Sequence, residues 1–429
     1  MFNQNGLSLD QAPPISVVFR FFFSGALFGI LAGIIILFFG PAIFKTHTPQ
    51  AIILTHILTL GVMLSFMFAA LFQMLPVIAG ITLTAPVQKA NWLQYPFILG
   101  VFALLSAFQS AVPWLYGVAS LLLGGSLFYI ISVMLKNLFE LGHHSTSSKG
   151  IILALLSLAL VLILALYMTA TLSGIINGTY FIQIREGHYS FGLFGWISLL
   201  IIAISFQVIE MFYVTPPYPK IISHYLPAIL TALLVVTFIT GLFLPSLWII
   251  SDILLALLLS IYALVTLLRL TQKKRPLSDA TIWFWRTGLL SLILSMLVLI
   301  LTLFINNHIL TSVMYLLFAS FALSIVFAMF YKIIPFLTWF HLNSQGYFTA
   351  PMMHEVIHPK TATKHLYIHL ATLVTFLLSF FINTSFIYLA GILTILSFSW
   401  MTWQIIHAHL LYKKTQENGE KFEMNIPAS

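Results

Sequence analysis

The chain has 429 residues, of which 60% are hydrophobic and only 7% charged. A soluble fold needs more polar surface than this to cover itself, so the composition excludes a soluble globular protein and predicts an all-α, polytopic membrane helix bundle. The sequence contains no cysteine, which excludes disulfides, thiolate metal sites, iron–sulfur clusters and cysteine nucleophiles.

A membrane span needs roughly 20 consecutive, mainly apolar residues. Twelve segments of the sequence meet this condition and are separated by short polar, Pro, Gly or Asn breaks. Three pairs of segments are predicted to be helical hairpins, with breaks at Pro113, Pro245 and Asn383. The predicted spans lie near 17–40, 51–80, 93–111, 114–139, 149–177, 189–214, 224–245, 246–270, 283–305, 308–336, 363–382 and 385–411.

Basic residues near the ends of spans stay on the cytoplasmic side. With a cytoplasmic N-terminus, Lys45 and Arg185 are the only basic residues on the outer side. We therefore predict a multi-pass protein of a bacterial inner membrane, with a retained first span, both termini in the cytoplasm and a cytoplasmic tail over 412–429. The formal net charge of +8 follows from this topology and from attraction to anionic lipids, so it requires no nucleic-acid partner.

Histidines recur at the start of every fourth span. His56 begins span 2, His188 begins span 6 and His308 begins span 10. The recurrence predicts one membrane domain built from three pseudo-repeats, near 17–139, 149–270 and 283–411. The alternative is that polar residues simply collect at helix starts, where imidazole tolerates an interface.

An imidazole inside hydrocarbon is a candidate metal ligand. His56 lies about five residues into its span, or roughly 7 Å below the surface. Its desolvation is offset when a metal binds one ring nitrogen and a second-shell acceptor binds the other. A histidine hydrogen-bonded to a neighbouring helix is the alternative, and it is the more ordinary explanation for His188 and His308 taken singly.

Twelve spans, three pseudo-repeats and outer-side histidines on spans 2, 6 and 10 resemble subunit I of the haem–copper oxidases. The resemblance implies that His56 and His308 are axial ligands of a low-spin, b-type haem, with their nitrogens roughly 4 Å apart across the iron. It further implies that His188 is a copper ligand, and it makes a redox partner or a quinone an expected partner.

The sequence departs from that family at three places. Gly192 stands where span 6 of the family has a tyrosine, the only histidine of span 7 is His224 at the cytoplasmic edge, and span 10 has one histidine, which follows Asn306 and Asn307. These departures indicate a protein other than a terminal oxidase. We expect a haem protein in electron transfer or in a redox or nitric-oxide response, with a looser similarity to the haem- and copper-binding NnrS proteins.

Two further sets of residues are candidates for function. Glu210, with Gln207 beside it, is a candidate proton or ion relay in span 6, and it favours a proton-coupled secondary transporter as the alternative function. Asp252 in span 8 is better explained as a helix cap.

The segment HEVIH matches the zinc-protease motif HExxH through His354, Glu355 and His358. Pro359 follows at once, which leaves room for only a short helix. His365 and His369 form another pair spaced to share one helical face.

Overall fold

The computed structural model describes residues 13–244, 248–274 and 278–421, and these ranges are mostly helical. Twelve of the described helices are long and apolar enough to cross a membrane. This confirms the predicted all-α membrane bundle and its number of spans. The predicted break at Pro245, the basic residue Arg275 and positions 422–429 of the predicted tail lie outside the described residues.

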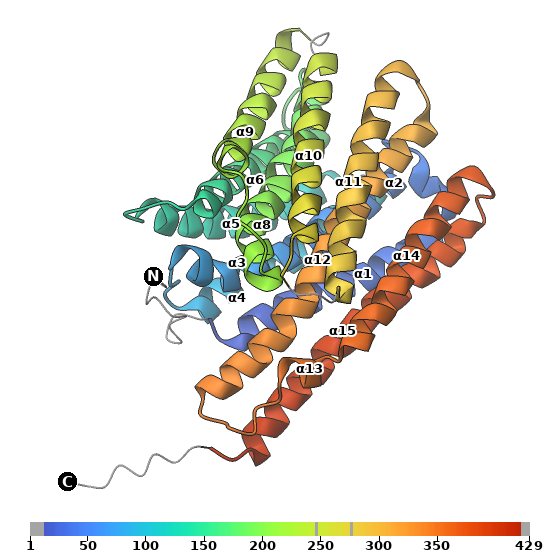
Figure 1. The fold of residues 1–429 in the computed structure, drawn as a ribbon. Helices are drawn as coiled ribbons and strands as arrows, with labels where there is room; N and C mark the ends of the chain where they lie inside the picture. The colour runs from blue at the N-terminus through green and yellow to red at the C-terminus, as the bar shows by residue number, and fades with distance from the viewer. Residues whose placement is uncertain (1–12, 245–247, 275–277, 422–429) are drawn as a thin grey trace.

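Several spans in the first half of the chain are divided into consecutive helical segments, as Figure 1 shows in blue to green. Span 1 consists of α1 (Ile15–Phe39) and η2 (Gly40–Phe44), and span 2 of α2 (Pro49–His56), η3 (Ile57–Leu64), α3 (Ser65–Met74) and η4 (Leu75–Ala79). Spans 3, 4 and 5 are the single helices α4 (Pro86–Ser110), α5 (Pro113–Phe139) and α6 (Thr146–Leu172). Span 6 consists of α7 (Phe181–Ser190), η5 (Phe191–Ser198) and α8 (Leu199–Tyr213). Spans 7 to 12 are α9 (Lys220–Phe243), α10 (Trp248–Thr271), α11 (Ala280–Phe304), α12 (His308–Ser344), α14 (Pro359–Phe381) and α15 (Phe386–Asn418). The short helix α13 (Met353–Val356) lies between α12 and α14.

The ends of the spans follow ordinary capping chemistry. Pro113 occupies the first turn of α5, where its missing N–H costs no hydrogen bond. Asp279 caps α11 by accepting from the backbone N–H of Ile282. Asn383 accepts from the N–H of Ser385 in the turn between α14 and α15. The predicted breaks at Pro113 and Asn383 are therefore confirmed.

Spans 2, 6 and 10 are the innermost helices of the bundle. Their central windows are 56%, 78% and 67% buried, whereas no other span in the described ranges exceeds 44%. The three spans meet around an apolar pocket of about 60 Å³, to which they contribute Met67, Ile204 and Met329 among others. The histidines at the starts of these spans are therefore attached to the helices that form the core of the bundle.

The outer helices expose large apolar side chains along their length, for example Leu121, Ile221 and Phe243. A continuous apolar exterior is suited to contact with lipid.

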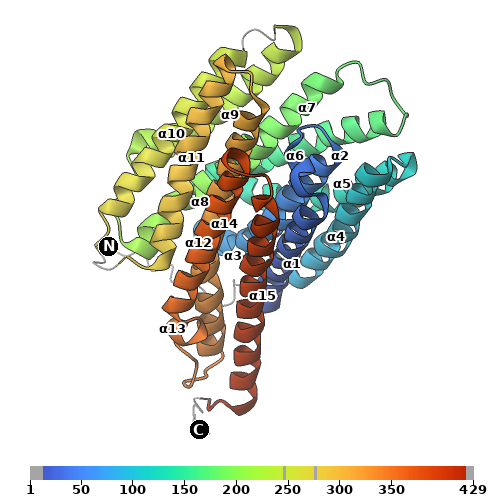
Figure 2. The same cartoon turned by 90° about the vertical axis from the view of Figure 1, so that its right-hand side faces the viewer.

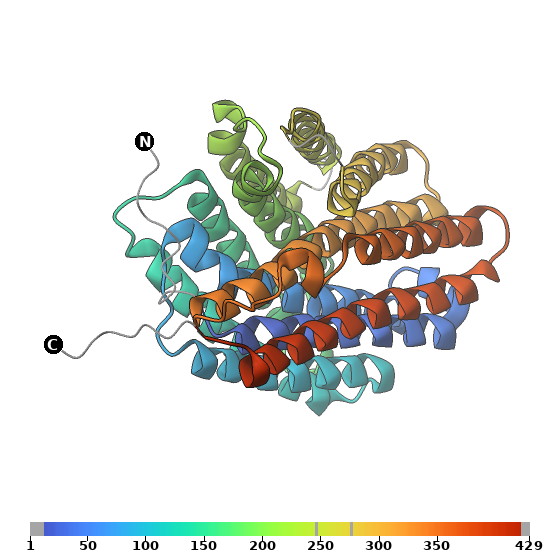
Figure 3. The same cartoon turned by 60° about the horizontal axis from the view of Figure 1, so that its bottom comes forward.

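Glycines bring α1 and α15 into close contact. Gly29 lies against the ring of Phe398, and Gly33 lies against Ile395 and the backbone of Gly391. Figure 3 shows the red C-terminal helix running beside the dark blue first helix. Small residues at four-residue spacing allow this approach, as in other membrane helix pairs.

The helices α12 and α15 are longer than a bilayer requires. They contain 37 and 33 residues, or roughly 50–55 Å at 1.5 Å per residue, against a hydrocarbon core of roughly 30 Å. Figures 1 and 2 show their ends projecting together with α13 beyond the other helices. An isolated β-bridge between Tyr347 and Lys421 joins the projecting ends.

Candidate metal centre

His56 and His188 occupy equivalent places in two of the inner spans. Each lies seven residues after the first residue of its span, Pro49 in one case and Phe181 in the other. At 1.5 Å per residue both imidazoles are therefore roughly 10 Å from the helix start. The matched depth is what a shared ligand requires.

A π-helical segment follows each of these histidines. The segment η3 begins directly after His56, and η5 begins three residues after His188. Mid-helix π-helices are rare and are concentrated at functional sites. Among the described residues, the corresponding helix α12 continues from His308 to Ser344 without such a segment, so only two of the three predicted repeats share this feature.

Backbone carbonyls orient both rings. His56 Nδ1 lies 2.8 Å from the carbonyl oxygen of Ile52, one turn earlier, and His188 Nδ1 lies 3.1 Å from that of Val161 on α6. A carbonyl oxygen only accepts, so each Nδ1 carries the proton and donates it. In the neutral ring Nε2 then keeps its lone pair, and neither Nε2 has a hydrogen-bond partner in the described part of the chain. This is the second-shell arrangement of a metal-binding histidine.

The two imidazole rings lie close together with nearly parallel planes. Their ring centroids are 6.3 Å apart and their planes differ by 18°. Two imidazoles bound on opposite sides of one metal have centroids about 6.2 Å apart, since each metal–nitrogen bond is about 2.0 Å and each nitrogen lies about 1.1 Å from its ring centre. A tetrahedral angle at the metal would shorten this separation to about 5 Å. The observed spacing therefore matches a trans pair.

The structure brings His56 together with His188 and not with His308. The ring neighbours of His56 are Phe108, at 4.9 Å, and His188. His308 is exposed at the first position of α12, and in the described residues it has no ring contact with either. The role of His308 as an axial ligand stays a prediction, and His308 is not part of the histidine pair described here.

The donor set has two members. Within the described ranges, no group of three or more His, Cys, Asp or Glu side chains is placed to hold a metal ion. A bare zinc or copper ion would need further ligands, whereas a porphyrin supplies four nitrogens itself and asks the protein for two axial ligands. The two pockets of about 60 Å³ are lined by neither histidine and are smaller than a porphyrin, so binding one requires the helices around the pair to move.

An acidic cluster lies beside this centre, and the sequence analysis found only one of its members. Glu186 and Asp252 line the same small pocket with Tyr189. Glu186 also forms an ion pair of 3.0 Å with Arg185. We had placed Glu186 outside the membrane, but α7 begins eight residues earlier than the predicted span and carries it inside. The polar run before His188 concealed the start of this helix.

Glu210 has a structural partner. Its Oε1 accepts from the backbone N–H of Tyr218 at 3.1 Å and so holds the connection between α8 and α9. Gln207, three residues earlier, is exposed. These contacts place Glu210 at the end of its span as a loop cap, and they give no support to a coupling site there.

The HEVIH motif does not form a zinc-binding helix. His354 and Glu355 lie in the four-residue α13, where Glu355 accepts from the backbone N–H of Met352, while His358 caps the next helix by accepting from Lys360. The two histidines therefore belong to different helices, and all three side chains of the motif are exposed. The two histidines therefore do not share one helical face, as the zinc-protease motif requires.

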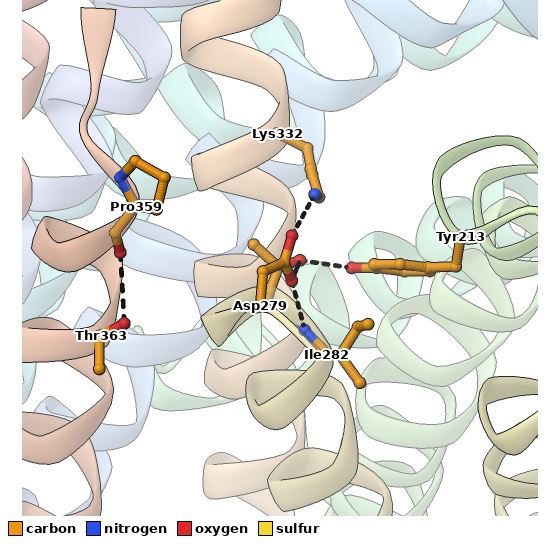
Figure 4. Close-up of polar contacts among 7 residues, drawn as sticks. Tyr213, Asp279, Ile282, Lys332, Pro359 and Thr363 are labelled. Carbon is orange, nitrogen blue, oxygen red and sulfur yellow. Dashed lines mark hydrogen bonds and ion pairs between the residues drawn. The ribbon is translucent and has the colours of Figure 1, made fainter. Parts of the chain in front are cut away.

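Figure 4 shows a polar network that joins α12 to the start of α11. Lys332 of α12 forms an ion pair of 2.6 Å with Asp279, whose other oxygen accepts from Thr281 at 2.6 Å, and Thr281 in turn accepts from the hydroxyl of Tyr213 at 2.9 Å. Burial alone would raise the pKa of Asp279, but the Lys332 ammonium and the hydrogen bonds bring it below its ordinary value.

Tyr218, in the connection that Glu210 caps, is likewise buried. Burial raises its pKa to about 12, and its hydroxyl donates to Thr266 at 3.1 Å. The connection between α8 and α9 is thus anchored at both its backbone and its side chain.

Comparison with known protein families finds no match to this chain, and comparison with curated proteins finds none that is detectably similar.

Proposed function

We propose that the protein is a haem-binding membrane protein whose iron is held between His56 and His188. The observation that carries the proposal is the pair of parallel imidazoles, 6.3 Å apart, each with Nδ1 bonded to a backbone carbonyl and Nε2 free. A pair of histidines with no third candidate ligand beside it among the described residues favours a cofactor that would bring most of its own metal ligands.

In this proposal the chain's own residues position and tune the centre. The carbonyls of Ile52 and Val161 fix the tautomer of each histidine and prevent the ring from turning. The apolar surroundings, including Phe108, exclude water. The haem would supply an iron that changes charge by one electron.

The number of axial ligands selects the kind of chemistry. If a haem were bound, His56 and His188 would both hold it, and it would supply one-electron redox chemistry with no protein-free position for oxygen or nitric oxide. We therefore propose electron transfer, or a redox response, in preference to direct reaction with a gas. With the predicted orientation the centre lies near the outer surface, within reach of a quinone or of an outer redox partner.

The test is an absorbance spectrum of the full-length chain, purified in detergent from haem-replete cells. We expect a Soret band with sharp bands on reduction, and we expect His56→Ala and His188→Ala each to remove them. The control variants His308→Ala and His407→Ala alter exposed histidines and should keep the spectrum. Absence of a Soret band in the wild-type chain would refute the proposal. If the wild-type chain instead contained copper and the His56→Ala and His188→Ala variants did not, the site would be a copper site and not a haem site.

A further inference from the structure

A second pair of histidines, His365 and His369, lies deep among the helices of the C-terminal third. Both are on α14, with exposed fractions of 0% and 6%. Both lie inside the predicted span 363–382, and the structure buries them between α11, α12 and α15. This burial needs an explanation, because an ionisable side chain inside a membrane bundle is energetically costly and usually belongs to a substrate, ion or proton pathway.

Hydroxyl groups satisfy the ring nitrogens of this pair. His365 Nδ1 lies 3.0 Å from the hydroxyl of Tyr331, and its Nε2 lies 2.7 Å from that of Ser397. His369 Nε2 lies 2.8 Å from the hydroxyl of Ser324. The cluster thus joins α12, α14 and α15 through groups that can each donate and accept a hydrogen bond.

Apolar rings enclose the pair. The Phe327 ring is 4.6 Å from that of His365 and 5.2 Å from that of His369, and Phe284 contacts both imidazoles. The direct partners of the two imidazoles are hydroxyl groups and not charged side chains. No charged side chain among these direct partners therefore holds a proton at one position in the cluster.

The cluster continues toward both ends of the bundle. Tyr331 adjoins Lys332, which belongs to the ionic network of Figure 4. In the other direction, Ser324 lies one helical turn from Ser320, whose hydroxyl is 3.0 Å from that of Ser291. From Tyr331 to Ser320 the polar groups extend over roughly 16 Å at 1.5 Å per residue.

The continuation stops inside the bundle. Ser295, one turn beyond Ser291, donates its hydroxyl to the carbonyl oxygen of Met314 at 2.9 Å. A carbonyl cannot pass a proton on, so the column reaches inward from one surface without crossing the membrane. An arrangement of this kind can deliver a proton to the interior of the bundle without conducting protons from one side of the membrane to the other.

We infer that Tyr331, His365, Ser397, His369 and Ser324 form a proton relay from the Lys332 end of α12 into the interior of the bundle. The inference is independent of the proposed metal centre, because none of these residues contacts His56 or His188.

The transfer conserves charge at each group. In one concerted step a hydronium ion at the Lys332 end protonates the Tyr331 oxygen, Tyr331 gives its hydroxyl proton to His365 Nδ1, and His365 Nε2–H gives its proton to the Ser397 oxygen. The next imidazole is one helical turn away, with Cβ atoms about 5–6 Å apart, a gap that one water molecule spans. In the same step Ser397 passes its own hydroxyl proton through that water to His369 Nδ1, and His369 Nε2–H gives its proton to the Ser324 oxygen. Ser324 releases its own hydroxyl proton to a water on the Ser320 side, so every group ends with the charge it began with.

A purely structural role makes a different prediction for hydrogen exchange. Fixed hydrogen bonds in a buried core protect ring N–H groups until the bundle opens, whereas a relay exchanges them in the closed state. Solid-state nuclear magnetic resonance on the full-length chain, with ¹⁵N-histidine and in lipid bilayers, separates the two. His365→Gln and His369→Gln assign the signals.

We expect both ring N–H groups to exchange with heavy water within minutes in the wild-type chain. Tyr331→Phe keeps the aromatic ring and removes the hydroxyl, and it should slow exchange at least about tenfold at both histidines. Tyr412→Phe removes a hydroxyl that contacts Gln345 outside the cluster and should leave the rate unchanged. Backbone exchange in α14, measured on the same samples, should be equal in all three.

Protection for hours in the wild-type chain would overturn the relay, as would equal exchange in wild type and Tyr331→Phe. If Tyr331→Phe does not fold, Ser397→Ala serves in its place, since it interrupts the relay beyond His365. In that variant exchange should slow at both histidines, because His365 Nε2 loses its proton acceptor and the path to His369 is broken. Unchanged exchange at either site, with equal backbone exchange in α14, would contradict the inference.

Discussion

The ammonium of Lys332 lies 2.6 Å from a carboxylate oxygen of Asp279, and this pair joins α12 to the start of α11. The lysine side chain is 18% exposed and the aspartate 42% exposed, so solvent screens the pair partly. Asp279 also caps α11 through the N–H of Ile282. Asp279 thus contributes to stability in two separable ways.

Substitutions at this position should separate the ion pair from the cap. Asp279→Asn keeps an N-cap oxygen and removes the charge, so it should lower the free energy of unfolding by about 0.5–1 kcal/mol. Asp279→Ala removes both and should cost about 1–2 kcal/mol. Thermal unfolding of the purified variants in one detergent checks the order. Equal effects of the two variants would show that the charge contributes nothing.

The same pair predicts an acid-sensitive contribution to stability. The pKa of Asp279 is lowered in the folded chain, so the ionised form is favoured by folding. Its stabilisation is complete above the unfolded-state pKa of about 3.9 and disappears as the pH falls through the lower folded value. The stability difference between wild type and Asp279→Asn should therefore be constant from pH 7 to about 5 and shrink below about 4. A difference that stays constant down to pH 3 would contradict this assignment.

Hydrophobicity was sufficient to predict the twelve spans, because crossing a membrane demands long apolar runs whatever the tertiary contacts. Equal spacing along the chain also identified His56 and His188. The spacing could not show which histidines contact each other. That pairing depends on how each helix is rotated and on the π-helical segments, and the spacing of histidines along the chain predicts neither.

Polar residues near span ends were the least predictable. Glu186 lies before the predicted start of span 6 because its local sequence is polar, yet the span begins earlier, at Phe181. His365 lies inside the predicted span 363–382, but its complete burial was not predicted. Glu210 was given a coupling role because it is an acid in an apolar run, whereas its nearest partner is the backbone of Tyr218. Partners from other elements decided these cases, and no local pattern records them.

The loop-capping role of Glu210 predicts a stability effect. Glu210→Ala leaves the Tyr218 N–H without its acceptor and should lower the free energy of unfolding by about 1 kcal/mol. Glu210→Gln keeps an acceptor oxygen and should remain within about 0.5 kcal/mol of wild type. Limited proteolysis of the connection over 214–219 should accelerate only in the alanine variant.

Gln207→Ala is the matched control for this experiment, because Gln207 is exposed on the same helix. It should change stability by less than about 0.5 kcal/mol. A glutamine variant as unstable as the alanine variant would show that the charge of Glu210, and not its hydrogen bond, is what the fold uses.

The contact between α1 and α15 predicts a steric effect at Gly29. A Cβ at this position would lie 2.2 Å from ring atoms of Phe398, so Gly29→Ala forces the ring or the helices to move. Overpacking of this kind should lower the free energy of unfolding by about 1–3 kcal/mol, despite the better helix propensity of alanine. Gly125→Ala on α5 provides the comparison, since its Cβ would meet no atom within 4 Å, and it should leave stability unchanged or raise it by up to about 1 kcal/mol. Thermal unfolding in one detergent measures both. If Gly29→Ala proves as stable as Gly125→Ala, the close approach of α1 and α15 is not a feature of the folded protein.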